Sequence, residues 1–165
     1  QNVVPVRQAL SNHVGNATLF LTTLDSGRHS VYSHGLPDGG RIEVEAATLD
    51  EFFQTEGWPS IDLVKIDVEG AELDVLDGME ESLRRWKGVR LIVELNPSLL
   101  RDAEAEPVRL FDMLTTLGFH AWCIEDEGGF EALEPAGFGL LDKRLSADQT
   151  SVNLLFSRRW EEFAF

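Results

Sequence analysis

The stretch IDLVKIDVEGAELDVL, residues 61–76, decides the fold. Its first eight residues, Ile61–Val68, are rich in β-branched side chains, which is typical of a strand covered on both faces in a parallel sheet. From Ala71 to Trp86 apolar residues recur every three or four positions, which predicts a helix with one face packed on that sheet. Gly78 interrupts the helical pattern, and we expect a break or a kink there.

Downstream of this unit the sequence continues to alternate strand and helix. Val89–Leu95 reads as a second buried strand. Pro107 and Gly118 bracket a helix, since proline suits the first helical turn and glycine suits a C-terminal cap. Two more strands are predicted, at Phe119–Ile124 and Val152–Phe156. This order predicts an α/β fold with a mainly parallel sheet and right-handed crossovers.

Upstream of the deciding stretch the predicted elements are shorter. Val3–Leu10 and Ala17–Leu21 resemble two strands joined by a polar turn, which predicts a hairpin. Arg41–Ala46 alternates apolar and charged residues as a half-exposed strand does. Thr48 and Glu51 form a capping box that begins a short helix. Two turn-rich stretches are expected to be loops: residues 33–40 and 125–139.

Length and composition limit the partners and the compartment. The chain of 165 residues fits a single domain, residues 1–165. Fourteen basic and 29 acidic residues give a net charge of -15, which repels phosphate backbones and anionic lipids, so we expect no nucleic acid and no membrane partner. With no apolar run near the roughly 20 residues of a membrane span, we expect a cytoplasmic protein. Cys123 is expected to be a buried hydrophobe, and the four histidines, which lack a metal-ligand spacing, to lie at the surface.

Both predicted central strands end in polar residues. Ligands of open parallel sheets bind beyond the carboxyl ends of the strands, so Asp67 and Glu69 after one strand, and Glu94 and Asn96 on the next, are candidates for function. If the strands are neighbours, these four side chains converge on one edge of the sheet. Structural roles compete with this interpretation. A carboxylate at the start of a helix commonly caps it, and Lys65 needs an ion-pair partner that Asp67 can supply.

The segment Ile61–Met79, IDLVKIDVEGAELDVLDGM, resembles the signature of the FkbM family of S-adenosylmethionine-dependent methyltransferases. The likeness extends over nearly the whole chain, including LIVELN at residues 91–96 and VNLLF at residues 152–156. It implies a Rossmann-like class I methyltransferase sheet, mainly parallel with a closing antiparallel strand. It also implies methyl transfer from S-adenosylmethionine to a hydroxyl group of a small molecule or glycan.

The resemblance further implies roles for individual residues. Asp67 and Glu94 would handle the hydroxyl proton or orient the substrate, and Glu69 and Asn96 would place hydroxyl groups. Asp67 would also contact the cofactor. Three residues would lie near its adenine ring: Ala9, Leu10 and Ser11. Asp67, Glu94 and Asn96 also form an oxygen-rich set that could hold Mg²⁺, as a less expected alternative to a metal-free site.

The sequence departs from the family pattern at its beginning. The family's first strand with its glycine-rich turn, and the second strand with its ribose-binding acid, have no counterpart, so the N-terminal strands of the sheet are expected to be missing. Ile61–Val68 should then be an exposed hydrophobic edge that invites self-association, and the chain should bind S-adenosylmethionine weakly or not at all. The alternative function is a non-catalytic α/β scaffold or partner-binding module that has lost cofactor binding.

Overall fold

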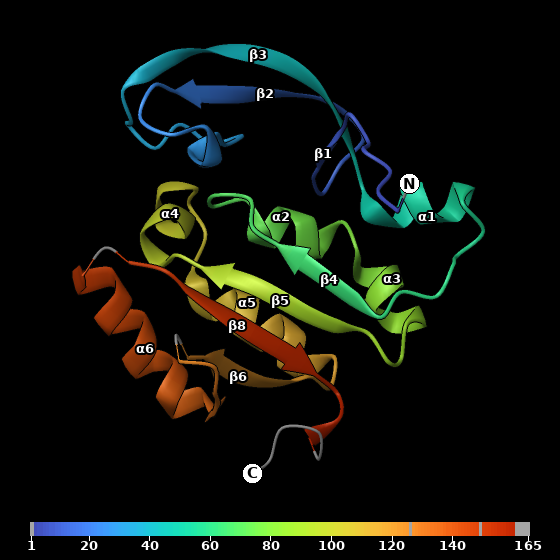
Figure 1. Ribbon diagram of the computed structural model, residues 1–165, viewed down its shortest axis with the longest axis vertical. Helices are drawn as coiled ribbons and strands as arrows, with labels where there is room; N and C mark the ends of the chain where they lie inside the picture. Colours follow the sequence, from blue (N-terminus) through green and yellow to red (C-terminus); the bar gives the residue numbers. More distant parts are fainter. Residues whose placement is uncertain (1, 126, 149, 161–165) are drawn as a thin grey trace.

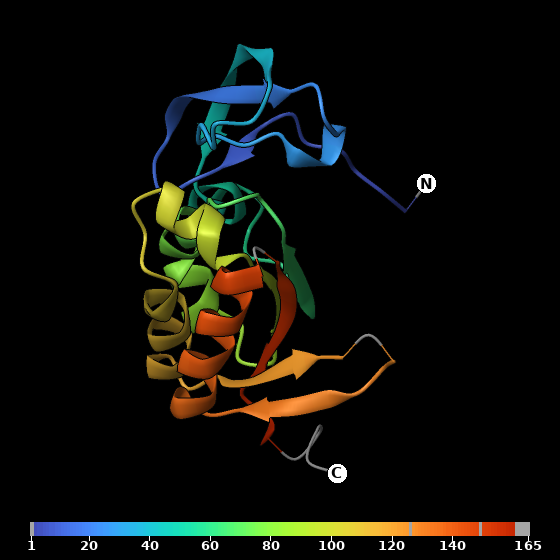
Figure 2. The ribbon, with the colours of Figure 1, turned by 90° about the vertical axis from the view of Figure 1, so that its left-hand side faces the viewer.

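The computed structural model describes residues 2–125, 127–148 and 150–160, and it contains two sheets (Figure 1). The smaller sheet lies at one end of the molecule in both views (Figures 1 and 2). Its strand order is β1 (Ala9–Leu10), β3 (Asp38–Ala47), β2 (Gly15–Thr22). The larger sheet has the order β4 (Leu63–Ile66), β5 (Arg90–Leu95), β8 (Val152–Ser157), β6 (His120–Ile124), β7 (Phe130–Leu133). The described part of the chain is therefore an α/β structure.

The helices gather on one side of the larger sheet (Figure 2). They are α1 (Leu49–Thr55), α2 (Glu72–Asp77), α3 (Glu80–Arg85), α4 (Pro97–Asp102), α5 (Pro107–Thr116) and α6 (Pro135–Asp148). The 3₁₀ turn η1 (Ser26–Arg28) lies beside the smaller sheet (Figure 1). The burial of β5 alternates because helices cover only one face of the sheet. Leu91, Val93 and Leu95 are fully buried, whereas Ile92 and Glu94 are half-exposed. The expectation of strands covered on both faces is therefore wrong for these strands.

The larger sheet is mixed and not mainly parallel, which corrects the sequence prediction. Only β4 and β5 pair in parallel, whereas β8 is antiparallel to both β5 and β6, and β7 is antiparallel to β6. The cause is the insertion of β8 between β5 and β6, which gives each an antiparallel neighbour although β4, β5 and β6 share one direction. The closing strand runs antiparallel, as expected. Because β4 is an edge strand with Leu63 53% exposed, the expected hydrophobic edge is confirmed, and self-association through it stays a prediction.

The smaller sheet pairs differently from the predicted hairpin. Strands β1 and β2 do not pair with each other, because both flank β3, β1 in parallel and β2 antiparallel. Most of the predicted strand Val3–Leu10 forms no strand, and its Val4 is 84% exposed. Pro5 lies within this run and has no N–H to donate to a sheet, which explains why only Ala9–Leu10 is paired. The hairpin of this region is β2 with β3.

The interruption expected at Gly78 separates two short helices, α2 and α3. A Cβ atom at Gly78 would lie 2.0 Å from the main-chain oxygen of Ser11, so the close approach of this segment requires glycine. The N-terminus of α3 is capped from α1, because the Asp50 carboxylate accepts from the main-chain N–H of Ser82 at 2.7 Å and from that of Glu81 at 2.9 Å. The predicted cap of α1 is confirmed, with Thr48 Oγ1 accepting from Glu51 N at 3.1 Å.

Three elements were not predicted. Pro97 is the first residue of α4, and residues expected to be a loop form β7 and the start of α6. In α6 the buried side chains recur with helical spacing at Phe138, Leu141 and Leu145. Gly137 and Gly139 made this segment look like a turn, although packing of Phe138 on Phe111, with ring centroids 4.7 Å apart, holds it as a helix.

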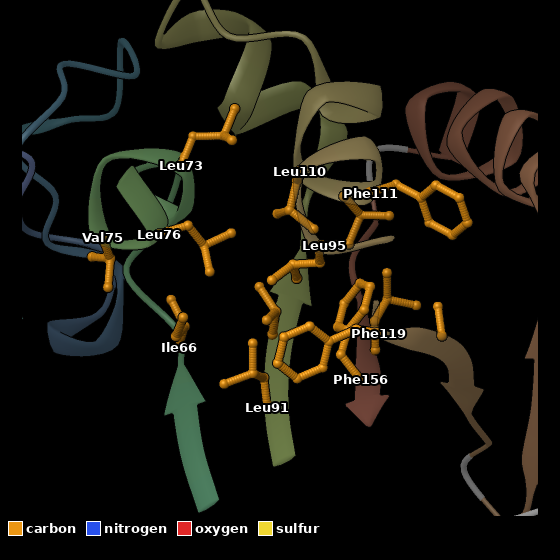
Figure 3. Packing of buried hydrophobic residues seen from close by; sticks show 14 of the residues in the cluster. Ile66, Leu73, Val75, Leu76, Leu91, Leu95, Leu110, Phe111, Phe119 and Phe156 are labelled. Carbon is orange, nitrogen blue, oxygen red and sulfur yellow. The ribbon is translucent and has the colours of Figure 1, made fainter. Parts of the chain in front are cut away.

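The hydrophobic core lies between the larger sheet and its helices (Figure 3). Side chains of the sheet, such as Ile66, Leu91 and Phe156, meet Leu76 of α2 and Leu110 of α5. The prediction of a buried cysteine is confirmed at Cys123, which forms no disulfide. Among the described residues no helix is both long enough and apolar enough to cross a bilayer.

Candidate functional site

The turn after β4 carries two of the predicted site residues in a tightly held backbone. Glu69 and Gly70 both adopt left-handed conformations, with φ values of 52° and 96°. The Glu72 carboxylate, 1% exposed, accepts from Gly70 N at 3.1 Å and closes the turn. Burial raises the pKa of the Glu72 carboxyl. Since a Cβ at Gly70 would lie 2.9 Å from the Leu99 oxygen, the turn also packs against α4. Sequence reasoning missed this role of Glu72.

The segment after η1 holds the same turn from the other side. Ser30 Oγ donates to the Glu69 carbonyl at 2.7 Å, and His34 Nε2 donates to it at 2.8 Å. The His34 side chain is only 2% exposed, and its Nδ1 lies 3.5 Å from an Asp102 carboxylate oxygen. The expectation that all four histidines lie at the surface is therefore wrong for His34, because the turn and α4 enclose it. These bonds fix Glu69 although its backbone conformation is unfavourable for a non-glycine residue.

Three of the four predicted polar residues meet at the carboxyl ends of β4 and β5. Carboxylate oxygens of Asp67, Glu69 and Glu94 lie within 4.8 Å of one another, and we call these three residues the acidic group. The register explains the meeting, because parallel pairing of Ile66 with Val93 aligns the two strand ends. The predicted convergence is thus found for these three side chains.

The pKa values of two carboxyls in the acidic group are shifted in opposite directions. The hydrogen bond from Lys65 Nζ to Asp67 Oδ2, 3.0 Å long, lowers the pKa of Asp67. Burial raises the pKa of Glu94, and its hydrogen bond with Asp67 raises it further, although the Ser151 hydroxyl donates to Glu94 at 2.8 Å. Of the two carboxylates, that of Glu94 therefore has the higher affinity for a proton. The pair with Lys65 was predicted, but both side chains are substantially exposed and not buried.

The pKa of Glu69 is also raised, mainly by burial, while the nearby Arg28 acts in the opposite direction. With three carboxylates so close, the site has a net negative charge that favours a cation or a proton. Such a group can accept the proton of a hydroxyl or lie beside a positively charged ligand. Arg28 was not among the residues that the sequence singled out.

Asn96 has a structural contact of its own. Its Oδ1 accepts from Leu99 N at 3.4 Å and caps α4. Of the three expected Mg²⁺ ligands, Asp67 and Glu94 therefore come together with Glu69, whereas the oxygen of Asn96 is directed to the helix N-terminus. Exposed carboxylates are often found close together without a metal ion, and Lys65 already supplies part of the opposite charge.

The residues expected near adenine lie where β1 meets the helices. Ala9 and Leu10 are half-buried and pair with Ala46 and Ala47 of β3. Ser11 is buried, and its N–H donates to the Ala47 carbonyl at 2.9 Å. Of these three residues, Leu10 packs against the hydrophobic core and Ser11 is buried, so the role near adenine stays a prediction. The negative charge of the acidic group suits the positive sulfonium of S-adenosylmethionine, so the residues fit the cofactor at this place.

Comparison with known proteins identifies the family. The model of the methyltransferase FkbM domain matches residues 2–121, which is most of the chain. The chain belongs to the FkbM methyltransferase family. The resemblance of the signature segment to this family is thereby confirmed.

Two curated relatives of the FkbM chain are methyltransferases. The hexuronic acid methyltransferase AglP of Haloferax volcanii is 32% identical over 95 residues, which cover 57% of this chain and 37% of AglP. The 2-O-methyltransferase NoeI of Sinorhizobium fredii is 46% identical over 48 residues, which cover 29% of this chain and 20% of NoeI. The chain thus spans well under half the length of either relative. No solved structure matches it.

The FkbM chain also has a pocket that the sequence did not predict. It has a volume of about 200 Å³ and lies between the β2–β3 hairpin and the segment after η1. Its lining includes Ser30 and His34, the two residues that hold the Glu69 carbonyl, together with Arg28 and Arg41. Most of these residues lie in stretches without helical or strand periodicity, so no sequence pattern marks them as neighbours of the acidic group.

Proposed function

We propose that this chain carries out methyl transfer from S-adenosylmethionine to a hydroxyl group of a sugar or related small molecule, on a Rossmann-like class I scaffold. The observation that carries the proposal is the acidic group, Asp67, Glu69 and Glu94, at the carboxyl ends of two adjacent parallel strands. This edge is where ligands bind in α/β sheets. The names of AglP and NoeI support a sugar acceptor and an oxygen as the methylated atom.

The chain's share of the reaction is to orient the acceptor and to take its proton. When bound, the cofactor supplies an electrophilic methyl group and leaves as S-adenosylhomocysteine. With the cofactor and acceptor bound, the Asp67–Glu94 pair would take the proton of the acceptor hydroxyl as its oxygen receives the methyl group. Because the pKa of Glu94 is raised, its carboxylate is the stronger base of the two. Glu69 accepts a hydrogen bond from a neighbouring acceptor hydroxyl, and Asn96, whose oxygen caps α4, orients a hydroxyl through its amide N–H groups.

The experiment is a methyl-transfer assay with labelled S-adenosylmethionine and a panel of sugar acceptors. Glu94→Gln should lower kcat by roughly 10² to 10⁴, the usual worth of a general base. Glu131→Gln changes an exposed carboxylate on β7 in the same way and should leave the rate unchanged. Full activity of Glu94→Gln, with an unchanged melting temperature, would contradict the proposed role of the pair.

A calorimetric titration with S-adenosylmethionine separates the enzyme from its rival. Micromolar binding of S-adenosylmethionine by the 165-residue chain would support the enzyme and contradict the weak binding expected from its sequence. A non-catalytic scaffold predicts that neither this chain nor a longer form of the protein methylates any acceptor. Methyl transfer that depends on Glu94 rules the scaffold out.

A further inference from the structure

The pocket beside the acidic group has the size of a site for one small molecule. Its volume of about 200 Å³ is below the roughly 300 to 1,000 Å³ of sites for drug-sized ligands, so it suits a single sugar ring. Phe20 and Leu36 provide apolar wall, while Ser30 and Tyr32 add polar atoms. Such a mixture is typical of pockets that bind a ring with hydroxyl groups.

The pocket is unusual in its charge. The chain as a whole has 29 acidic and 14 basic residues, yet the pocket lining has two arginines, Arg28 and Arg41, and one carboxylate, Asp38. The Asp38 carboxylate accepts from Gly40 N at 2.7 Å, which occupies one of its oxygens within its own turn. The lining of the pocket therefore has a net positive charge, although the protein as a whole is negatively charged.

The two guanidinium groups also lack the partners that other arginines of the chain have. Several arginines form ion pairs with carboxylates: Arg84, Arg85, Arg101 and Arg109. Within the described residues, no ion pair of Arg28 or Arg41 is formed within 4.0 Å. Arg41 lies over the Phe20 ring at 5.8 Å, and Arg28 acts on Glu69 only through its field. Their N–H donors are consequently free to bind a ligand.

The pocket adjoins the acidic group through direct bonds. Ser30 and His34 line the pocket, and both donate to the main-chain oxygen of Glu69. A ligand in the pocket therefore has Arg28 and Arg41 at its own walls, and two residues of that wall, Arg28 and His34, act electrostatically on the Glu69 carboxyl. This arrangement allows one molecule to present an anionic group to the arginines and a hydroxyl group to Asp67 and Glu94.

We propose that the pocket binds the acceptor of the methyl group and that this acceptor is a uronic acid, whose carboxylate Arg28 and Arg41 recognise. Arginine suits this task because its planar guanidinium binds a carboxylate through two N–H donors. A singly charged carboxylate fits better than a phosphate, since Asp38 and the acidic group repel a second negative charge. The proposal rests on the proposed function, because the acidic group must serve methyl transfer for the pocket's ligand to be its acceptor.

The test measures binding of methyl glucuronoside, methyl glucoside and glucose 6-phosphate to the purified protein by calorimetry. Methyl glucuronoside should bind at least tenfold more tightly than the other two. Arg28→Gln and Arg41→Gln should each raise the Kd of methyl glucuronoside about tenfold, the worth of one charge-assisted hydrogen bond, and leave that of methyl glucoside unchanged. Arg84→Gln removes an exposed arginine on α3 and should change neither Kd.

Methyl transfer to the same sugars, measured in parallel, separates this proposal from the proposed function. Methylation of methyl glucoside as fast as methyl glucuronoside, with no effect of Arg28→Gln on KM, overturns the uronic acid proposal and leaves the proposed function standing. Tighter binding of glucose 6-phosphate overturns it as well. Arginine-dependent binding of methyl glucuronoside without any methyl transfer would support a binding site for an anionic sugar and contradict the proposed function.

Discussion

The two sheets of the chain are held together by different forces. In β5 of the larger sheet every second side chain is fully buried, whereas in β3 of the smaller sheet the first six residues are exposed. Burial of apolar surface stabilises the first sheet, and main-chain hydrogen bonds with few buried side chains maintain the second. The larger sheet therefore contributes the buried apolar surface that stabilises the fold, and it carries the acidic group of the proposed chemistry. The smaller sheet, with its pocket, is then the part that can vary with the acceptor.

The largest expected effect tests this contrast on stability. Leu95→Ala removes a side chain that is 0% exposed and should lower the free energy of unfolding by about 2 to 5 kcal/mol. Ile42→Ala on β3, where the side chain is 47% exposed, should cost less than about 1 kcal/mol. Urea denaturation monitored by circular dichroism gives both values. Equal losses for the two variants would show that the smaller sheet is as important for stability as the larger one.

The next effect concerns the contact that joins the two regions. A Cβ at Gly78 would lie 2.0 Å from the Ser11 oxygen, so Gly78→Ala must displace either the segment after β1 or the helices α2 and α3. Overpacking of this kind should cost about 1 to 3 kcal/mol of stability. Thermal denaturation measures the change.

Gly139→Ala is the matched control for this substitution. Gly139 lies within α6, and a Cβ there would meet nothing within 4 Å. The better helix propensity of alanine should stabilise the protein by about 0.5 to 1 kcal/mol. Opposite signs for the two glycine variants support the contact with Ser11, whereas stabilisation by both would mean that the β1 segment does not press on Gly78.

The sequence predicted the larger sheet better than the smaller one for a physical reason. Periodic burial leaves a pattern in the sequence, so the strands near Ile66 and Val93 and the convergence of Asp67 with Glu94 could be deduced. β8 lies between β5 and β6 through contacts distant in sequence, which no local pattern encodes. The same holds for β1, whose partner β3 begins almost thirty residues further along the chain.

Site residues were missed where their role depends on nonlocal packing or on a cap. Asn96 was predicted on a strand, although asparagine before proline also begins a helix, as it does in α4. In the sequence, Glu72 is only one glutamate within a helical pattern. Its burial depends on the left-handed turn at Gly70, from whose N–H it accepts a hydrogen bond. Arg28 acts electrostatically on Glu69 from the short 3₁₀ turn η1, which no periodicity in the sequence marks.

A smaller effect tests whether the proposed chemistry belongs to the larger sheet alone. The ionised Asp67–Glu94 pair must take the proton, so the rate should fall as the pH falls through the pKa of the pair. Lys65 lowers the pKa of Asp67, so Lys65→Met should raise this pKa and move the loss of activity to higher pH. The pH profile of kcat/KM measures the shift, and Arg28→Gln should move it less. An unchanged profile for Lys65→Met would remove Asp67 from the reaction.

The smallest expected effect is that of a chelator, which should leave the rate of methyl transfer unchanged. Two contacts argue that the acidic group functions without a divalent ion. Lys65 offsets the charge of Asp67, and the oxygen of Asn96 caps α4. Assays with EDTA and with added Mg²⁺ test the expectation.

Loss of activity in EDTA with recovery in Mg²⁺ would mean that the acidic group binds the ion when the substrates are present. Glu69→Gln would then distinguish the two roles of the site. For a metal ligand, the substitution should weaken Mg²⁺ activation, because a neutral amide replaces one of three clustered carboxylates. For a residue that only orients hydroxyl groups, it should raise KM for the acceptor and leave the dependence on Mg²⁺ as it was. In either case the acidic group takes part in the chemistry at the larger sheet. The acceptor site proposed beside the smaller sheet is tested separately, by the variants of Arg28 and Arg41.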